Sequence, residues 1–222
     1  VIKGNLQVGE PRRLLPENCG ANERAALSPD GTRFAAVGQA GGFVGSLANG
    51  SDLQAISQGA ADTVTFSPDG RWLRLASHHD PIIHIRLAAD GTMVTNLQTR
   101  SGAALFVPGG KELLAMGQST FSYWQLGTWQ KLRELPYGEG GEGFVGFAPD
   151  GSYALANGRD LMLRLWDLEA NREIACLRLP EGSAAWACVF DSSGRHMATT
   201  SSYPFLRVWD FPTLRRELRR LG

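Results

Sequence analysis

Hydrophobic and polar residues alternate along this chain in short runs that end at turns rich in proline and glycine. Val64-Thr65-Phe66 precedes one such turn, and Phe144-Val145-Gly146-Phe147 precedes another. In Leu163-Arg164-Leu165 the two leucines face one side of a strand and the arginine faces the other. A period of two predicts β-strands, so the pattern favours an all-β chain built from short strands.

The turns recur at a nearly constant interval. Their sequences are Ser28-Pro29-Asp30-Gly31, Ser67-Pro68-Asp69-Gly70, Val107-Pro108-Gly109-Gly110, Ala148-Pro149-Asp150-Gly151 and Ser192-Ser193-Gly194. The five turn glycines follow one another at intervals of 39 to 43 residues. Proline presets φ early in such a turn, and glycine takes the left-handed position. A strand-turn-strand unit repeated about every 40 residues is typical of a β-propeller.

A second motif follows each turn. Leu163-Arg164-Leu165-Trp166-Asp167 and Leu206-Arg207-Val208-Trp209-Asp210 are nearly identical, and each tryptophan lies 15 residues after its turn glycine. Phe121 to Gln125 is a copy without the acid, and Ile83 to Leu87 and Phe43 to Leu47 are degenerate copies. Together the two motifs resemble the WD40 repeat family over essentially the whole chain. The resemblance implies a propeller whose blades each contain four antiparallel strands, a to d, with strand c ending at the Trp-Asp pair.

The chain departs from the family pattern in its polar residues. A typical repeat joins a histidine before strand a, an aspartate in the b–c turn, a strand-b hydroxyl and the tryptophan in one buried network. No histidine precedes a strand a here, and the aspartate survives only as Asp80 and Asp160. We therefore expect blades held mainly by apolar packing, with Trp166 and Trp209 buried between neighbouring blades.

The repeats divide the chain into one partial and five complete four-stranded blades. The expected boundaries are 1–18 for the partial blade, then 22–60, 61–101, 102–141, 142–182 and 183–212, followed by a helix at 213–222. In the partial blade, Val1–Lys3 is expected to end a strand c and Arg12–Leu15 to form a strand d. A seven-bladed ring needs about 280 residues, so we expect this chain to be a fragment whose propeller other domains or chains complete.

The tail carries the chain's one clear helical pattern. Leu214, Leu218 and Leu221 are spaced i, i+4 and i+7, and Thr213 is a candidate N-cap. Its arginines could form a nucleic-acid arm, but the leucine stripe favours a helix packed on the propeller. Similar endings occur in large bacterial WD40 proteins, many of which carry a serine/threonine protein kinase domain upstream.

Composition narrows the classes of partner. Twenty-two basic residues balance 22 acidic ones, so no overall field attracts nucleic acid or an acidic membrane. No apolar run reaches the length of a membrane span. Three cysteines without CxxC spacing favour a reducing, cytoplasmic location, with Cys176 and Cys188 as small buried thiols.

No pattern in the sequence predicts catalysis, a metal or a cofactor. His78, His79, Asp80 and His84 have metal-ligand side chains, but adjacent residues of a hairpin point to opposite faces and cannot easily share one ion. His196 lacks a nucleophile at a recognisable spacing. The glycines at 138–143 lack the Lys-Ser/Thr ending of a phosphate loop and include two acids.

The loops before strand a and between strands b and c are therefore the expected binding surface, on the narrow face of the propeller. Large or charged residues there are the candidate contacts: Asp62, His79, Arg100, Tyr137, Glu142, Arg159, Trp186 and Tyr203. The simpler alternative is that they decorate a solvated rim. We expect a non-catalytic scaffold that binds a protein or peptide. The alternative is the regulatory or sensory region of a larger enzyme, such as a bacterial serine/threonine protein kinase.

Overall fold

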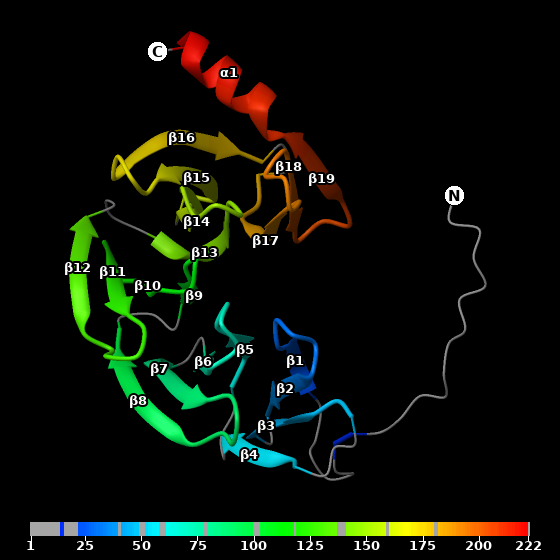
Figure 1. Ribbon diagram of the computed structural model, residues 1–222. Coiled ribbons are helices and arrows are strands. Elements are labelled where there is room, and N and C mark those ends of the chain that lie inside the picture. The colour runs from blue at the N-terminus through cyan, green and yellow to red at the C-terminus, as the bar shows by residue number, and fades with distance from the viewer. Residues whose placement is uncertain are drawn as a thin grey trace.

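The computed structural model is a β-propeller of five blades arranged in an arc, followed by one helix (Figure 1). The structure describes residues 14–15, 22–39, 41–48, 52–57, 61–77, 80–99, 103–117, 119–136, 141–158, 160–179 and 182–221. The strands that begin each blade lie toward the middle of the arc, and the fourth strands lie outside (Figure 1). The first and last blades form the two ends of the arc and do not adjoin (Figure 1).

Each blade is an antiparallel sheet whose strands follow in chain order from the inside outward. Blade 1 contains β1 (Asn22–Leu27), β2 (Arg33–Gly38), β3 (Gly41–Ser46) and β4 (Gln54–Ser57). Blade 2 contains β5 (Thr63–Phe66), β6 (Trp72–Ser77), β7 (Asp80–Leu87) and β8 (Met93–Gln98). Blade 3 contains β9 (Ala104–Phe106), β10 (Glu112–Met116), β11 (Thr120–Gln125) and β12 (Lys131–Pro136). Blade 4 contains β13 (Gly141–Phe147), β14 (Tyr153–Gly158), β15 (Met162–Asp167) and β16 (Arg172–Arg178).

Blade 5 corrects the expectation of five four-stranded blades, because it has only three strands among the described residues. These are β17 (Ala185–Phe190), β18 (His196–Ser201) and β19 (Leu206–Asp210). The helix α1 (Phe211–Leu221) follows β19 directly and takes the place of strand d in the chain. Pro212 cannot donate to a sheet, and it suits the first turn of a helix. Asp210, and not Thr213, caps the helix, since its Oδ1 accepts from the Thr213 backbone N–H at 2.8 Å.

The turns between strands a and b have one geometry in all five blades, although their sequences differ. The N–H of each turn glycine donates to the carbonyl three residues earlier, at 2.9 to 3.1 Å. Neighbouring turns also touch, because a Cβ built on Gly194 would lie 3.5 Å from Pro149, and one on Gly70 would lie 3.6 Å from Pro29. The turn motifs therefore position each blade against the preceding one.

Apolar packing between sheets forms the core, as the sequence pattern indicated. Trp166 is 6% exposed and meets Phe121 of blade 3 edge to face, with ring centroids 5.4 Å apart. Trp209 was also expected to be buried, but it is only half-buried in the cluster between blades 4 and 5. Its Nε1–H donates to Thr199 Oγ1 at 3.1 Å. The tryptophan and the strand-b hydroxyl are two of the four groups in the network that the resemblance implies.

The start of the chain is described only in part. Leu14 and Leu15 belong to no strand, and the rest of the expected partial blade at 1–18 lies outside the described residues.

Cys188 is buried, and burial raises the pKa of its thiol to about 12. Cys176 is exposed on β16, so the expectation of a buried thiol there was wrong. In the described part of the chain, no helix is long and apolar enough to cross a membrane.

Candidate interaction site

The structure describes the side chains of only two of the eight predicted contact residues, Asp62 and Tyr203. The other six fall into two groups. His79, Arg100, Tyr137 and Arg159 lie outside the described residues. Glu142 and Trp186 are described in their backbone alone. The clustering of the eight residues therefore stays a prediction.

Glu142 and Trp186 lie in strands, which corrects their placement in loops. Glu142 is in β13 and Trp186 is in β17, and each falls at a register shift near the start of its strand. Such a bulge inserts one extra residue against the partner strand, so the ladder continues past it toward the loop. The glycine-rich run at 138–143 hides this strand start in the sequence.

Asp62 is engaged within its own blade. Its Oδ2 accepts from Ser77 Oγ at 2.9 Å, and its backbone N–H donates to the Ala76 carbonyl at 3.0 Å. The aspartate thus joins the start of strand a to the end of strand b. The geometry gives it a structural role, and a carboxylate held in this way is less available to a partner.

Tyr203 is an exposed side chain in the loop between β18 and β19. Its ring is 49% exposed and stacks on Phe205, with centroids 6.4 Å apart and planes 11° from parallel. The Arg207 guanidinium lies 5.8 Å from the Phe205 ring. Two stacked aromatic rings with an adjacent arginine have the composition of a protein-binding hot spot.

The exposed surface continues from this loop onto the outer face of blade 5. Leu206 is 67% exposed, Val208 is 64% exposed and Val189 is 63% exposed. Val189, Ala198 and Val208 form one row across the three strands, and Leu206 lies two residues away on the same face. We call Val189, Tyr203, Phe205, Leu206 and Val208 the blade 5 patch.

The same position is buried in each of the other blades. Val208 pairs with the residue four positions after its turn glycine, and the residues that do so in blades 1 to 4 are Val44, Ile85, Tyr123 and Leu165. Those four are only 0%, 0%, 2% and 0% exposed, because each packs against the following blade. Blade 5 thus presents a surface of core composition with nothing described upon it.

The opposite end of the arc shows the complementary feature. Phe190 ends the first strand of blade 5 and packs toward blade 4, as phenylalanines do in blades 2, 3 and 4. The equivalent Leu27 of blade 1 is 63% exposed. Among the described residues, no atom lies within 4 Å of a Cβ built on Gly31, the first turn glycine. Within the described residues, both ends of the arc are therefore uncovered.

Two polar contacts between blades were not foreseen. Arg74 of β6 is 4% exposed and donates to Thr63 Oγ1, to Thr65 Oγ1 and to the Ala104 carbonyl of blade 3. Burial lowers the pKa of its guanidinium to about 10. Asn157 of blade 4 exchanges hydrogen bonds with the backbone of Ala185 in blade 5. The sequence signal that could have indicated these contacts is a polar side chain within an otherwise apolar strand b.

The two histidines within the described residues, His84 and His196, contact side chains of their own blades. His196 Nδ1 lies 3.0 Å from Asp191 Oδ2 in the blade 5 turn. His84 Nδ1 lies 2.8 Å from Asn96 Oδ1, and its Nε2 lies 3.8 Å from Asp80 Oδ2. Within the described ranges, no three His, Cys, Asp or Glu side chains are grouped so that they could hold a metal ion. His78 and His79 lie outside those ranges.

Comparison with known proteins supports the fold alone. No protein-family model matches the sequence, and no curated protein matches it. Among solved structures 1439 chains match, so the fold is too widespread to select a function. One is the hydrazine synthase of Kuenenia stuttgartiensis, with a TM-score of 0.70 and 14% identity over 89% of this chain. This chain spans 59% of that one. The five-bladed propeller is thus established, and the WD40 assignment stays a prediction.

Proposed function

We propose that this chain is a non-catalytic protein-interaction scaffold that binds a protein or peptide through the blade 5 patch and the adjoining d–a and b–c loops of the narrow face. One observation carries the proposal. The blade 5 patch exposes Leu206 and Val208 at positions that the other blades bury almost completely. Contiguous apolar surface of this kind marks sites of protein–protein contact in soluble proteins.

The shape and composition of the patch favour a protein partner over a polyanion. Tyr203 and Phe205 supply aromatic surface beside the aliphatic face, and Arg207 is the nearby cation. Binding to nucleic acid would require many phosphate contacts from basic residues. The chain as a whole has a formal net charge of zero.

The structure of the other junctions indicates what kind of partner fits. In blades 1 to 4 this face is covered by a neighbouring β-sheet, whose first strand contributes an apolar side chain such as Phe66 or Phe190. A partner that presents a β-sheet with such a residue would reproduce those contacts. Other domains or chains that complete the propeller meet this description.

Affinity capture from the native host tests the proposal. Leu206→Asp/Val208→Asp places two charges on the patch and is expected to remove the partner. The matched control is Met93→Asp/Leu132→Asp, which adds the same charges at positions 56% and 46% exposed on blades 2 and 3. The control is expected to retain the partner. If both double variants fold and recover the same proteins, the patch is not the binding surface.

A second variant tests the loops that the sequence singled out. Arg100→Ala/Tyr137→Ala/Trp186→Ala removes large side chains contributed by three different repeats. Loss of the partner in this variant would support the narrow-face assignment. A folded variant that retains every partner would restrict the interaction to blade 5, and recovery of nucleic acid alone would overturn the proposed class of partner.

A further inference from the structure

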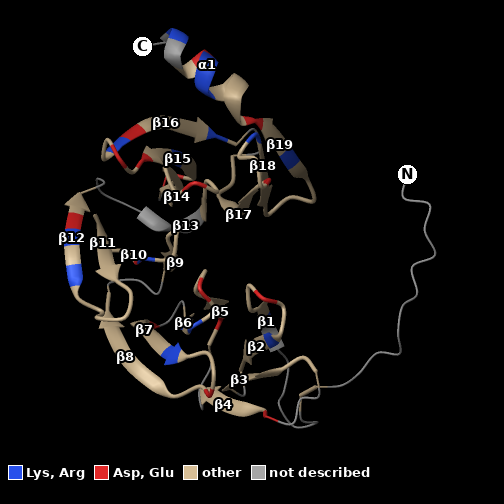
Figure 2. Ribbon diagram, viewed as in Figure 1, with Lys and Arg blue, Asp and Glu red and all other residues tan. Residues whose placement is uncertain are grey.

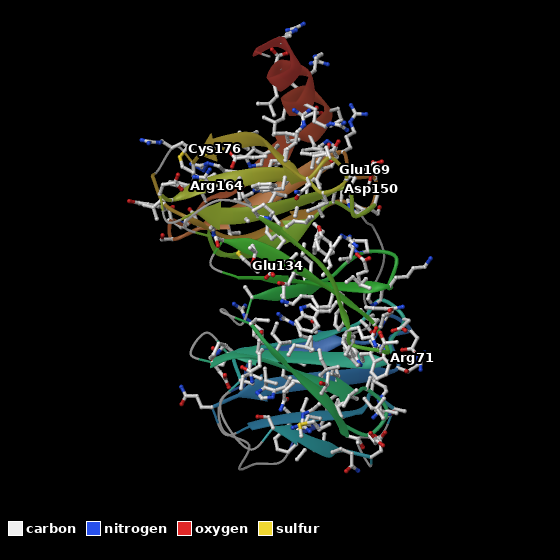
Figure 3. The ribbon with its side chains drawn as sticks, turned by 90° about the vertical axis from the view of Figure 1, so that its left-hand side faces the viewer. Arg71, Glu134, Asp150, Arg164, Glu169 and Cys176 are labelled. Atoms are coloured by element: carbon white, nitrogen blue, oxygen red, sulfur yellow. The ribbon has the colours of Figure 1, made fainter. Side chains whose placement is uncertain are left out.

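A pocket of about 990 Å³ lies between α1 and the turns of blades 4 and 5. Blade 4 contributes Pro149, Asp150 and Tyr153 to its walls, and blade 5 contributes the turn that ends at Arg195. Figure 3 shows Asp150 and Glu169 on one side of the propeller, with Arg164 and Cys176 on the other. The pocket therefore lies on the face of the a–b turns, away from the b–c loop that carries Tyr203.

The helix is fixed over this pocket by its apolar side. Phe211, Leu214 and Leu218 pack into the cluster between blades 4 and 5. Phe211 meets Tyr153 and Phe190 edge to face, with ring centroids 5.7 and 5.2 Å apart. The packing places Arg215, Arg216 and Arg220 beside the blade turns, and basic segments of α1 are visible in Figure 2.

Four arginines line the pocket, against a single aspartate. They are Arg195, Arg215, Arg216 and Arg220. Their side chains remain accessible, since Arg195, Arg216 and Arg220 are 66%, 60% and 67% exposed. Arg215 is half-buried, with its guanidinium 4.9 Å from the Tyr153 ring. Each guanidinium offers five N–H donors, so the walls hold many donors for an anionic ligand.

The nearby carboxylates do not neutralise this group. Glu217 is shared by Arg216, at 3.6 Å, and Arg220, at 3.0 Å. Asp210 is 3.8 Å from Arg195 and is already the cap of α1. Asp150 accepts from both the backbone N–H and the Oγ–H of Ser152. Four guanidiniums therefore face three carboxylates, which leaves one positive charge in excess among these groups.

We propose that this pocket binds an acidic peptide segment of a partner protein. Carboxylates of the peptide would pair with the arginines, because the guanidinium fork matches a carboxylate in two hydrogen bonds. An apolar peptide side chain would lie against Pro149, Tyr153 and Phe211. The pocket is far larger than one small anion, so an extended peptide fills it better than a compact anion does. This site is separate from the blade 5 patch.

Fluorescence anisotropy of the whole chain tests the site. The probe is a labelled peptide in which glutamates alternate with phenylalanine, and the comparison peptide has glutamine in place of glutamate. Arg216→Ala/Arg220→Ala is expected to weaken binding of the acidic peptide about tenfold or more, since each lost charged hydrogen bond contributes more than a neutral one. Both positions are exposed on a helix, where alanine is well tolerated.

Arg71→Ala/Arg178→Ala is the matched control. It removes the same charge from blades 2 and 4 outside the pocket, and it is expected to bind the peptide as wild type does. Equal weakening in both double variants would show non-specific attraction and overturn the site. Equal affinity for the glutamine peptide, or tighter binding of tripolyphosphate than of the acidic peptide, would overturn the ligand class. Leu206→Asp/Val208→Asp is expected to leave peptide binding intact, which separates this proposal from the interaction at blade 5.

Discussion

The a–b turns show how much one residue can change without loss of the fold. In blades 1 and 2 the hydroxyls of Ser28 and Ser67 accept the backbone N–H five residues later, at 2.9 and 3.0 Å. In blade 5 the Asp191 carboxylate does the same for His196, at 3.2 Å. Val107 and Ala148 have no such group, yet the backbone bonds of their turns remain. The glycine and the backbone bonds therefore define the turn, and the polar side chain only reinforces it.

The carboxyl of Asp191 is expected to titrate well below an ordinary aspartate. Hydrogen bonds from the His196 side chain and backbone lower its pKa to about 2. A depressed pKa means that this interaction stabilises the fold above the unfolded value, near 3.8, and that the contribution is lost as the pH falls toward 2. Carboxyl NMR titration measures the value directly. His196→Ala should raise it, whereas the pKa of Asp90 on blade 2 should not move, and an unchanged Asp191 would contradict the assignment.

At the scale of the elements, the strands and their order follow from the turn period, but contacts between blades do not. Alternation along β6 suggests a solvent-exposed arginine, yet Arg74 is buried, and two threonine hydroxyls and the Ala104 carbonyl accept hydrogen bonds from its guanidinium. Those partners are up to 30 residues away in the chain. The sequence also did not indicate that blade 5 lacks a described fourth strand. The leucine spacing of the tail predicted a helix after a complete blade, whereas α1 follows the third strand directly.

The two tryptophans of the Trp-Asp motifs should differ in their contribution to stability. Trp166→Ala is expected to lower the free energy of unfolding by about 3–5 kcal/mol, the usual range for a buried large aromatic side chain. Trp209→Ala should cost less, because this side chain is only half-buried. Urea denaturation of both variants tests the order. Thr199→Val serves as a control for the hydrogen bond to Trp209 alone, and a loss under about 1 kcal/mol for Trp166→Ala would place that residue outside the core.

For the whole molecule, the sequence predicted a propeller of repeated blades, but it predicted little of the candidate site. Tyr203 was recognised because it is a large residue in an expected b–c loop. The exposed face of blade 5 could not be recognised from Leu206 and Val208 alone, since the equivalent residues of other blades are core. The arginine pocket depends on Arg195 meeting the tail helix, which requires knowing how α1 packs. Sequence pattern and composition therefore do not predict surfaces that are formed by segments distant in the chain.

The blade 5 patch predicts that this chain, studied alone, associates with itself as its concentration rises. Leu206 and Val208 are 67% and 64% exposed, and contact with a second copy would remove this apolar surface from water. Leu206→Lys/Val208→Lys should reduce the average mass measured by sedimentation, with little change in thermal stability because both side chains are already exposed. Met93→Lys/Leu132→Lys adds the same charge on blades 2 and 3 and should leave the association unchanged.

Leu165→Lys, at the position equivalent to Val208 but 0% exposed, should instead disrupt the fold. A wild-type chain that remains monomeric at its highest soluble concentration would show that the patch does not drive self-association.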